Sequence, residues 1–549
     1  MQPTVPSAYQ DCWITQQLPA PHDWPLFCYS TPELMALQAK SHINCVAELF
    51  AQVRREGWED HPCLWLSPQT SWSYAELHQK SLQIAAFLTH DMGLLTGQRV
   101  LLRGRNSAML AACWLGVLLA GAVVVTTHPQ WRAEELASVI LKTQINYVLC
   151  EHELRMDWAL AEKISGLNIP QRYWGYTSPD SLENSLYVHH QSWQPVNTAW
   201  HDVAILAPTS GSTGQPKITA HSHRDVWAAC LCWPQQYLCA QPSDVFIGNA
   251  SLAFTFGLGG LLLFPMYAGS SIVMNAFRNT QELLAAIISY QATVLMATPT
   301  AYRLMMPNAH LLRNHFLRLC VSAGEALTCA THQGWLDATG LPLLNGIGST
   351  EMLHIFISGG LASSGEASLG TAVQGYEACV IDEQGHLVAT GKEGYLAVRG
   401  PTGCRYLQHE LQKQYVKNGW NITGDCVKQD ARGHFYFLGR YDDLIISGGN
   451  NISPTEVEAA LLHHPAVAEC AVVGQKDAER GQIVLAYVVL HPGTLANNKM
   501  MLNLQNHAKE RLAPYKYPRR IIFVDALPRN PSGKLQRHQL ATAAIKEEI

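Results

Sequence analysis

Apolar runs suited to buried strands alternate with helical segments over much of this chain. A largely buried helix is predicted at 107–121 and an amphipathic helix at 132–144. Strands are predicted at 99–104, 122–128, 146–151, 293–299 and 318–324, with a further helix at 282–291. Because strands that alternate with helices build βαβ units, the chain is predicted to form parallel sheets covered by helices on both faces.

The pattern changes after about residue 370, where short strands and glycine turns replace the alternation. A polar, glycine-rich stretch at 439–454 is interpreted as a domain junction. Beyond it, two helices and three strands predict a small α+β domain of about a hundred residues. The predicted fold class is therefore α/β, with a large region of parallel α/β subdomains, a small β-rich subdomain and a small C-terminal domain.

Composition excludes several classes of protein. The most apolar stretch, 257–274, holds four glycines and a proline without basic flanks, so a buried strand–turn–strand is predicted rather than a membrane span. A net charge of −5 with no basic block gives no electrostatic case for nucleic-acid binding. The fifteen cysteines are scattered without a CxxC pair, which fits a reducing compartment. The N-terminus is not signal-like, so a cytoplasmic location is expected.

The loop TSGSTGQPK at 209–217 combines glycines, hydroxyl groups and a lysine after an apolar run. It is not a Walker nucleotide loop, because two residues separate its glycines and the lysine follows three positions after the second. Its physics is similar, since glycines let backbone N–H groups approach an anion while hydroxyls and a lysine add donors and charge. Alone, such a loop is more often a plain turn.

Four further motifs follow this loop in order. GSTEM at 348–352 sets a hydroxyl beside a carboxylate after an apolar strand, and carboxylates near phosphates commonly hold Mg²⁺. WNITGD at 420–425 ends in an acid suited to ribose hydroxyls. GRYDDLI at 439–445 and PRNPSGKL at 528–535 complete the set. Each motif is weak alone, but together, in this order and spacing, they strongly favour phosphate chemistry.

With these motifs the chain resembles the adenylate-forming acyl-CoA synthetases over about residues 40–545. PKITAHSHRDV, LAFTFGLGGLLLFP, GIGSTEMLHIFIS and VRGPTGCRYL are similar to aryl-CoA ligases for benzoate and especially 2-aminobenzoate. The resemblance implies that an aromatic acid and ATP form an acyl-adenylate, which coenzyme A then attacks with release of AMP. It also implies a requirement for Mg²⁺, an adenylation domain at 1–440 and a mobile domain at 441–549.

The resemblance assigns roles to individual residues. The phosphate loop comprises Thr209, Ser210, Gly211, Ser212, Thr213, Gly214 and Lys217. Adenine contacts fall to Gly324, Glu325 and Ala326, the α-phosphate to Thr350, Mg²⁺ to Glu351, the ribose to Asp425 with Arg440 beside it, and catalysis to Lys534. The acid pocket comprises Phe256, Gly257, Ile347 and His354; Asp442 is the hinge, and Ser447, Gly448 and Gly449 form the loop on the coenzyme A side.

Some positions depart from the family pattern, and the role of some histidines can be interpreted in two ways. Asn345 stands where relatives commonly carry Asp, Ile218 where Gly is frequent, and the junction IISGGNN lacks a common lysine. His354 either lines the acid pocket or packs below the site as a satisfied histidine. The HSH run at 221–223 lacks the additional ligands that a metal site needs.

Other functions compete with an aryl-CoA ligase. A stand-alone adenylation enzyme would load an aryl or fatty acid onto the phosphopantetheine thiol of a carrier protein. This sequence shows no carrier module, so the carrier would be a separate protein. An α-amino acid substrate is disfavoured, because Thr255 stands where amino-acid-activating domains usually place an Asp. A non-catalytic relative is disfavoured because the charged residues that the family's chemistry requires are all present.

Overall fold

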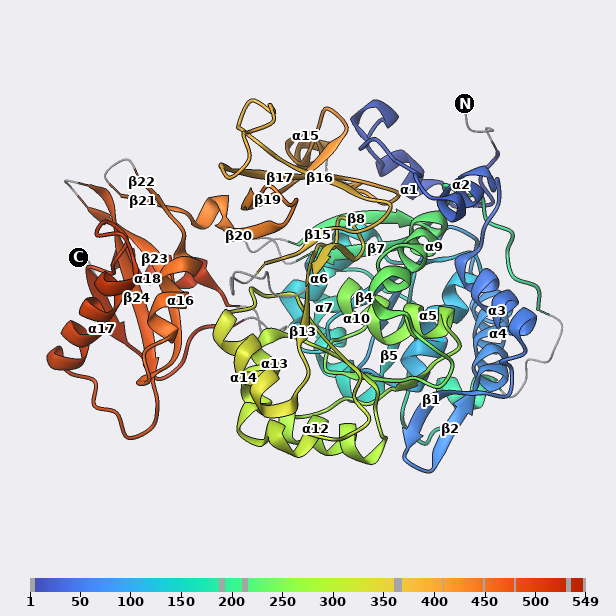
Figure 1. Cartoon of the computed structure of the whole chain (residues 1–549). Coiled ribbons are helices and arrows are strands. Elements are labelled where there is room, and N and C mark those ends of the chain that lie inside the picture. Colours follow the sequence, from blue (N-terminus) through green and yellow to red (C-terminus); the bar gives the residue numbers. More distant parts are fainter. Residues whose placement is uncertain are drawn as a thin grey trace.

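The computed structural model describes residues 5–186, 193–209, 216–359, 368–407, 409–447, 450–477, 480–529 and 535–546. A large domain contains two central sheets and a smaller antiparallel sheet, and a C-terminal domain lies at its side (Figure 1). Mixed α/β architecture with parallel sheets and a small C-terminal domain confirms the predicted fold class.

The first central sheet has six strands in the order β6-β5-β3-β4-β7-β8. Its neighbours pair in parallel except β7 and β8, which form an antiparallel hairpin with Thr209 opposite Lys217. The strands are β3 Arg99–Arg103, β4 Val123–Thr127, β5 Tyr147–Glu151, β6 Gln171–Trp174, β7 Val203–Thr209 and β8 Lys217–Ser222. The predicted phosphate loop therefore connects two paired strands.

The second central sheet has nine strands in the order β15-β14-β13-β12-β11-β9-β10-β1-β2. Strands β13 to β1 of this order pair in parallel, and β2, β14 and β15 are antiparallel at its ends. They are β1 Pro62–Ser67, β2 Thr70–Ser73, β9 Val245–Gly248, β10 Ser271–Val273, β11 Val294–Ala297, β12 Leu319–Ala323, β13 Leu343–Gly348, β14 Ile355–Gly359 and β15 Thr371–Ala372.

Helices separate the two central sheets and cover their outer faces. The middle layer contains α3 Cys45–Glu56, α4 Tyr74–His90, α5 Ala108–Leu119 and α9 His223–Leu231. The outer layers contain α6 Ala133–Thr143 and α7 Arg155–Ser165 on the first sheet, and α12 Thr280–Ser289, α13 Pro299–Met305 and α14 Cys329–Thr339 on the second. On β3, Val100 and Leu102 enter the middle core and Leu101 enters an outer one. Burial of both faces explains why these strands lack polar alternation.

The prediction of a strand–turn–strand at 257–274 is wrong over most of its length. The chain instead forms α10 (Thr255–Leu258), a π-helical turn η5 (Gly259–Leu263) and α11 (Phe264–Tyr267). Only the last part is a strand, β10. A segment that is buried on all sides is apolar throughout and carries no period, so its sequence does not separate a helix from a strand.

Two smaller sheets complete the chain. The antiparallel sheet of the large domain comprises β16 Glu377–Ile381, β17 Glu393–Arg399, β18 Val416–Lys417, β19 Trp420–Gln429 and β20 Phe435–Arg440, with α15 His409–Tyr415 beside it. The C-terminal domain comprises β21 Ile445–Ser447, β22 Asn450–Ile452, β23 Val467–Asp477, β24 Gly481–Leu490 and β25 Arg520–Phe523, with α16 Pro454–Leu462, α17 Asn498–Arg511 and α18 Arg537–Lys546. The 3₁₀ turn η7 (Tyr441–Asp443) separates them. The boundary at 440/441 stays a prediction.

Arg405 joins the last part of the large domain to α9. Its guanidinium is fully buried and pairs with the carboxylate of Asp225. It also lies 5.4 Å from the ring centroids of both Trp24 and Phe27. Burial lowers the pKa of Arg405 to about 10, so the side chain stays charged at neutral pH.

Arg405→Ala is expected to lower the free energy of unfolding of the large domain by about 3–5 kcal/mol, because Asp225 would stay buried without its partner. Arg399→Ala is the matched control, since it removes a pair with the half-exposed Glu377 and should cost less than about 1 kcal/mol. Scanning calorimetry measures both. Equal losses would show that the buried pair does not hold the two parts together.

Candidate active site

A cavity of about 230 Å³ lies between the large domain and the C-terminal domain. Four predicted ATP-binding residues line it: Gly324, Glu325, Ala326 and Arg440. The C-terminal domain contributes Glu458, Glu469, Arg529 and Arg537, among others. The adenine segment reaches the cavity because β12 ends at Ala323, and Gly324 takes a φ of +89° that favours glycine there.

Asp425 and Arg440 are paired next to this cavity. They are register partners on β19 and β20, and Arg440 Nη1 donates to Asp425 Oδ1 at 3.1 Å. Burial raises the pKa of the Asp425 carboxyl, which Arg440 partly opposes. Asp425 in turn raises the pKa of Arg440. A buried acceptor held by a cation is suited to binding hydroxyl groups, as the ribose assignment requires.

Thr350 and Glu351 follow the end of β13. Each accepts a hydrogen bond, Thr350 from a residue of β8 and Glu351 from the segment that pairs with β8. The Tyr406 hydroxyl donates to Glu351 Oε1. His221 Nε2 donates to the Thr350 carbonyl at 2.7 Å. Burial lowers the pKa of His221 to about 3, so the ring is neutral and its proton is on Nε2. The carboxylate predicted to hold Mg²⁺ is thereby fixed from one side.

Backbone pairing brings these groups together. Ala220 N–H donates to the Arg405 carbonyl at 2.9 Å, and Leu407 N–H donates to the Ile218 carbonyl at 3.0 Å. The segment carrying Tyr406 therefore lies along β8, and Lys217 Nζ is 6.0 Å from the centroid of the Tyr406 ring.

Sequence reasoning missed both Tyr406 and His221 as members of the site. Tyr406 belongs to VRGPTGCRYL and His221 to PKITAHSHRDV, two segments that already carry the resemblance to aryl-CoA ligases. The signal was a tyrosine and a histidine inside motif-like segments. The two segments are far apart in the sequence, and nothing in either one indicates that they lie side by side in the fold.

His354 is buried inside an aromatic enclosure. Its ring centroid lies 4.5 Å from that of Phe264, 5.3 Å from Trp233 and 6.0 Å from Phe256. Among the described residues, neither of its ring nitrogens has a hydrogen-bond partner. Burial lowers the pKa of His354 to about 3, with the Phe256 backbone acting weakly in the opposite direction. The imidazole is therefore neutral.

Two glycines shape this enclosure. A Cβ on Gly259 would lie 2.4 Å from His354 Cδ2, so only glycine leaves room for the ring. A Cβ on Gly257 would lie 2.1 Å from the Ser251 carbonyl oxygen, so Gly257 is required by packing. Phe256 and the β13 residue Ile347 are partly buried and pack against the same core.

Several predicted residues cannot be placed or have structural partners. Ser210–Gly214, Gly448, Gly449 and Lys534 lie outside the described residues, as does the side chain of Asp442. Ser447 is buried in β21, within the C-terminal domain. Asn345 Nδ2 donates to the Ser368 carbonyl at 3.1 Å. Ile218 is buried in the core beneath the first sheet. The site assignment as a whole stays a prediction.

The histidines of the HSH run have separate partners. His223 Nδ1 lies 3.2 Å from Cys45 Sγ, whereas His221 contacts Thr350. Within the described ranges, no cluster of three His, Cys, Asp or Glu side chains could hold a metal ion. A single carboxylate still fits Mg²⁺, which keeps several waters and takes its other ligands from substrate phosphates. Glu351 is therefore suited to this ion.

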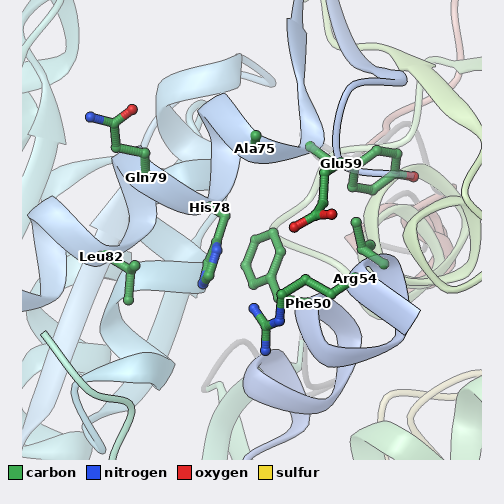
Figure 2. Close-up of a pocket in the computed structure, with 9 residues that line it drawn as sticks. Phe50, Arg54, Glu59, Ala75, His78, Gln79 and Leu82 are labelled. Carbon is green, nitrogen blue, oxygen red and sulfur yellow. The ribbon is translucent and has the colours of Figure 1, made fainter. Parts of the chain in front are cut away.

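A second cavity, of about 210 Å³, lies between α3 and α4. Figure 2 shows Phe50 and His78 facing each other there, with ring centroids 4.2 Å apart, and Glu59 and Arg54 nearby. Burial, assisted by Arg54, lowers the pKa of His78 to about 4. No predicted site residue lines this cavity. The predicted nucleotide-binding residues Gly324, Glu325, Ala326 and Arg440 line the interdomain cavity instead.

The sequence matches the family model described as AMP-binding enzyme over residues 50–406, and the AMP-binding enzyme C-terminal domain over residues 456–534. The chain belongs to this family of adenylate-forming enzymes. It is an AMP-forming acid–CoA ligase, which confirms the resemblance seen in the motifs. No helix in the described parts of the chain is long and apolar enough to cross a membrane.

Aryl-CoA ligases are among its relatives. A benzoate–CoA ligase of Thauera aromatica is 31% identical, covering 87% of this chain and 92% of the relative. The crystal structure of the anthranilate CoA ligase AuaEII in complex with anthranoyl-AMP matches with a TM-score of 0.85 at 30% identity, over 93% of this chain and 98% of that one. A benzoate CoA ligase from Burkholderia xenovorans LB400 matches with a TM-score of 0.82 at 30% identity, over 91% and 100%.

Tyr406→Phe is expected to slow acyl-adenylate formation about tenfold or more, because Glu351 loses a hydrogen bond to a charged group. The rate of ATP–pyrophosphate exchange against Mg²⁺ concentration measures this, and the half-saturating Mg²⁺ concentration should rise. Tyr74→Phe is the control, since it removes a buried phenol that donates to the Ser270 carbonyl far from Glu351. An unchanged Mg²⁺ dependence in Tyr406→Phe would contradict the assigned role.

Proposed function

We propose that this ligase activates an aromatic carboxylic acid of the benzoate or 2-aminobenzoate type and transfers the aryl group to coenzyme A. The enclosure around His354 carries the proposal. Its walls are Trp233, Phe256 and Phe264, and flat aromatic rings pack well against such surfaces. The neutral imidazole offers a hydrogen bond to a ring substituent without adding charge. Relatives that are benzoate and anthranilate CoA ligases support this substrate class.

The proposed first step joins two negatively charged reactants. The acid carboxylate attacks the α-phosphorus of ATP and displaces pyrophosphate, so catalysis consists mainly of positioning and of cations near the phosphates. Lys217 would contact the phosphates from the start of β8, and Lys534 would supply a second cation by family resemblance. Glu351 would hold Mg²⁺, which when bound neutralises phosphate charge. The reaction needs no side-chain nucleophile.

In the proposed second step the thiol of coenzyme A attacks the acyl carbon and displaces AMP, so Lys534 would have to leave the site first. We propose that the C-terminal domain turns about Asp442 between the steps. The neighbours of Asp442 support this pivot, because Tyr441 stacks on Tyr395 of β17 with ring centroids 3.5 Å apart. Asp443, by contrast, lies 3.8 Å from Arg537 of α18 in the C-terminal domain. The two residues that flank Asp442 are thus held by different domains, as a short hinge requires.

Benzoate and 2-aminobenzoate are expected to give a kcat/KM at least about a hundredfold above that of octanoate or a free α-amino acid, because the enclosure favours a flat, uncharged ring. AMP release over an acid panel measures this with coenzyme A as the acceptor. Repeating the panel with a carrier protein as acceptor distinguishes a carrier-loading enzyme. A preference for a straight-chain fatty acid would overturn the aryl assignment.

Asp442→Pro is expected to keep ATP–pyrophosphate exchange and to lose thioester formation by about two orders of magnitude. Proline fixes φ near −65°, which suits the 3₁₀ turn η7 and opposes rotation. Asp442→Ala is the matched control, because it removes the same side chain and leaves φ free. Parallel losses in both half-reactions of the proline variant would remove Asp442 as the pivot.

A further inference from the structure

Arg529 connects the two domains and lies shortly before the expected catalytic lysine in the sequence. Its Nη2 donates to Glu469 Oε2 of β23, in its own domain, at 2.6 Å. Its Nη1 donates to Thr300 Oγ1 of α13, in the large domain, at 3.4 Å. Arg529 precedes Lys534 by five positions in the motif PRNPSGKL. The guanidinium therefore connects the segment that leads to Lys534 with the large domain.

The hydroxyl of Thr300 is fully used in this arrangement. It donates to Glu325 Oε2 at 2.6 Å and accepts from Arg303 Nη2 at 2.8 Å as well as from Arg529. A hydroxyl has one proton to donate and two lone pairs to accept with. All three are occupied, so the position of Thr300 Oγ1 is determined by groups from both domains.

Charge is balanced across the contact. Arg303 and Arg529 converge on Thr300, while Glu325 and Glu469 lie beside them. All four charged side chains line the interdomain cavity. Burial lowers the pKa of Arg303; Glu325 and Glu469 oppose this and Arg529 reinforces it. A charge-assisted bond in a partly buried setting is stronger than an exposed ion pair.

Glu325 links the contact to the nucleotide site. It belongs to the predicted adenine segment and lines the cavity that Gly324 and Ala326 also line. The backbone N–H of Thr300 donates to the same Glu325 oxygen at 3.2 Å. A chain of hydrogen bonds thus runs from Glu325 through Thr300 and Arg529 to Glu469, from the large domain to the C-terminal domain.

We propose that Arg529 is a positioning residue that latches the C-terminal domain onto Thr300 during acyl-adenylate formation and releases it for thioester formation. This inference rests on the proposed two-step rotation. Of the two Arg529 hydrogen bonds described above, the 3.4 Å bond to Thr300 crosses between the domains, whereas the bond to Glu469 stays within the C-terminal domain. Other contacts also cross between the domains, such as the Thr455 hydroxyl, which donates to the Leu438 carbonyl at 3.0 Å. The bond to Thr300 therefore adds a bias to the domain equilibrium without locking it, which suits an enzyme that opens in every cycle.

Arg529→Ala and Thr300→Val test the latch with two separate assays. ATP–pyrophosphate exchange reports acyl-adenylate formation, and synthetic acyl-adenylate with coenzyme A reports thioester formation. Each variant is expected to lose about tenfold in exchange, the effect of one charge-assisted hydrogen bond, and to keep thioester formation. Arg519→Ala is the matched control, because Arg519 contacts the Tyr517 hydroxyl at 3.2 Å within the C-terminal domain. It should change neither rate.

The double variant separates a latch from independent effects. If Arg529 and Thr300 act through one bond, the exchange rate of the double variant is no lower than that of the more impaired single variant. Losses that multiply, equal losses in both half-reactions, or exchange that is unaffected would each overturn the proposal. Thr300→Val keeps the side-chain shape and lies in the other domain, so it carries the test even if Arg529→Ala is unstable.

The assays use whichever acid of the panel gives the fastest exchange. If a fatty acid gave the fastest exchange, the aryl assignment would be overturned, but the comparison of the two half-reactions would stay valid. Failure of the latch and failure of the proposed substrate class are therefore distinct results.

Discussion

The pairing of residues 405–407 with strand β8 determines where the charges of the active site lie. Lys217 begins β8, Tyr406 lies opposite Thr219, and the Tyr406 hydroxyl bonds Glu351. The buried pair between Arg405 and Asp225 anchors the same segment to α9. One structural pairing thus brings a cation, a phenol and a carboxylate together, at the place where the proposed reaction would join ATP and an acid carboxylate. Cations there offset the repulsion between two anionic reactants.

The domain junction divides its contacts in a way that fits a reaction with two incompatible steps. Tyr441 belongs to the large domain through its stack on Tyr395, and Asp443 belongs to the C-terminal domain through Arg537. The small domain meets the large one through polar contacts such as that of Arg529 with Thr300. Polar contacts of this kind can exchange with water, so they allow motion that an apolar interface would resist.

The sequence predicted the parts of the fold that depend on local pattern. The alternation of strands and helices gave the parallel sheets, because each apolar run has the length of a strand or a helix. It failed at 257–274, where burial on all sides removed the period that distinguishes the two. It also could not show that Tyr406 lies against Glu351, since that contact depends on pairing between distant segments. The aromatic walls around His354 likewise come from separate helices, although Phe256 and His354 were each expected at the acid pocket.

The proposed function places an aromatic acid in the enclosure beside His354 while its adenylate extends toward Asp425. A crystal structure with a non-hydrolysable 2-aminobenzoyl-adenylate analogue tests it most directly. The aryl ring is expected to lie against Phe256, with a ring substituent within hydrogen-bonding distance of His354 and the ribose hydroxyls on Asp425. An aryl ring bound elsewhere, with Phe256, Ile347 and His354 untouched, would contradict it.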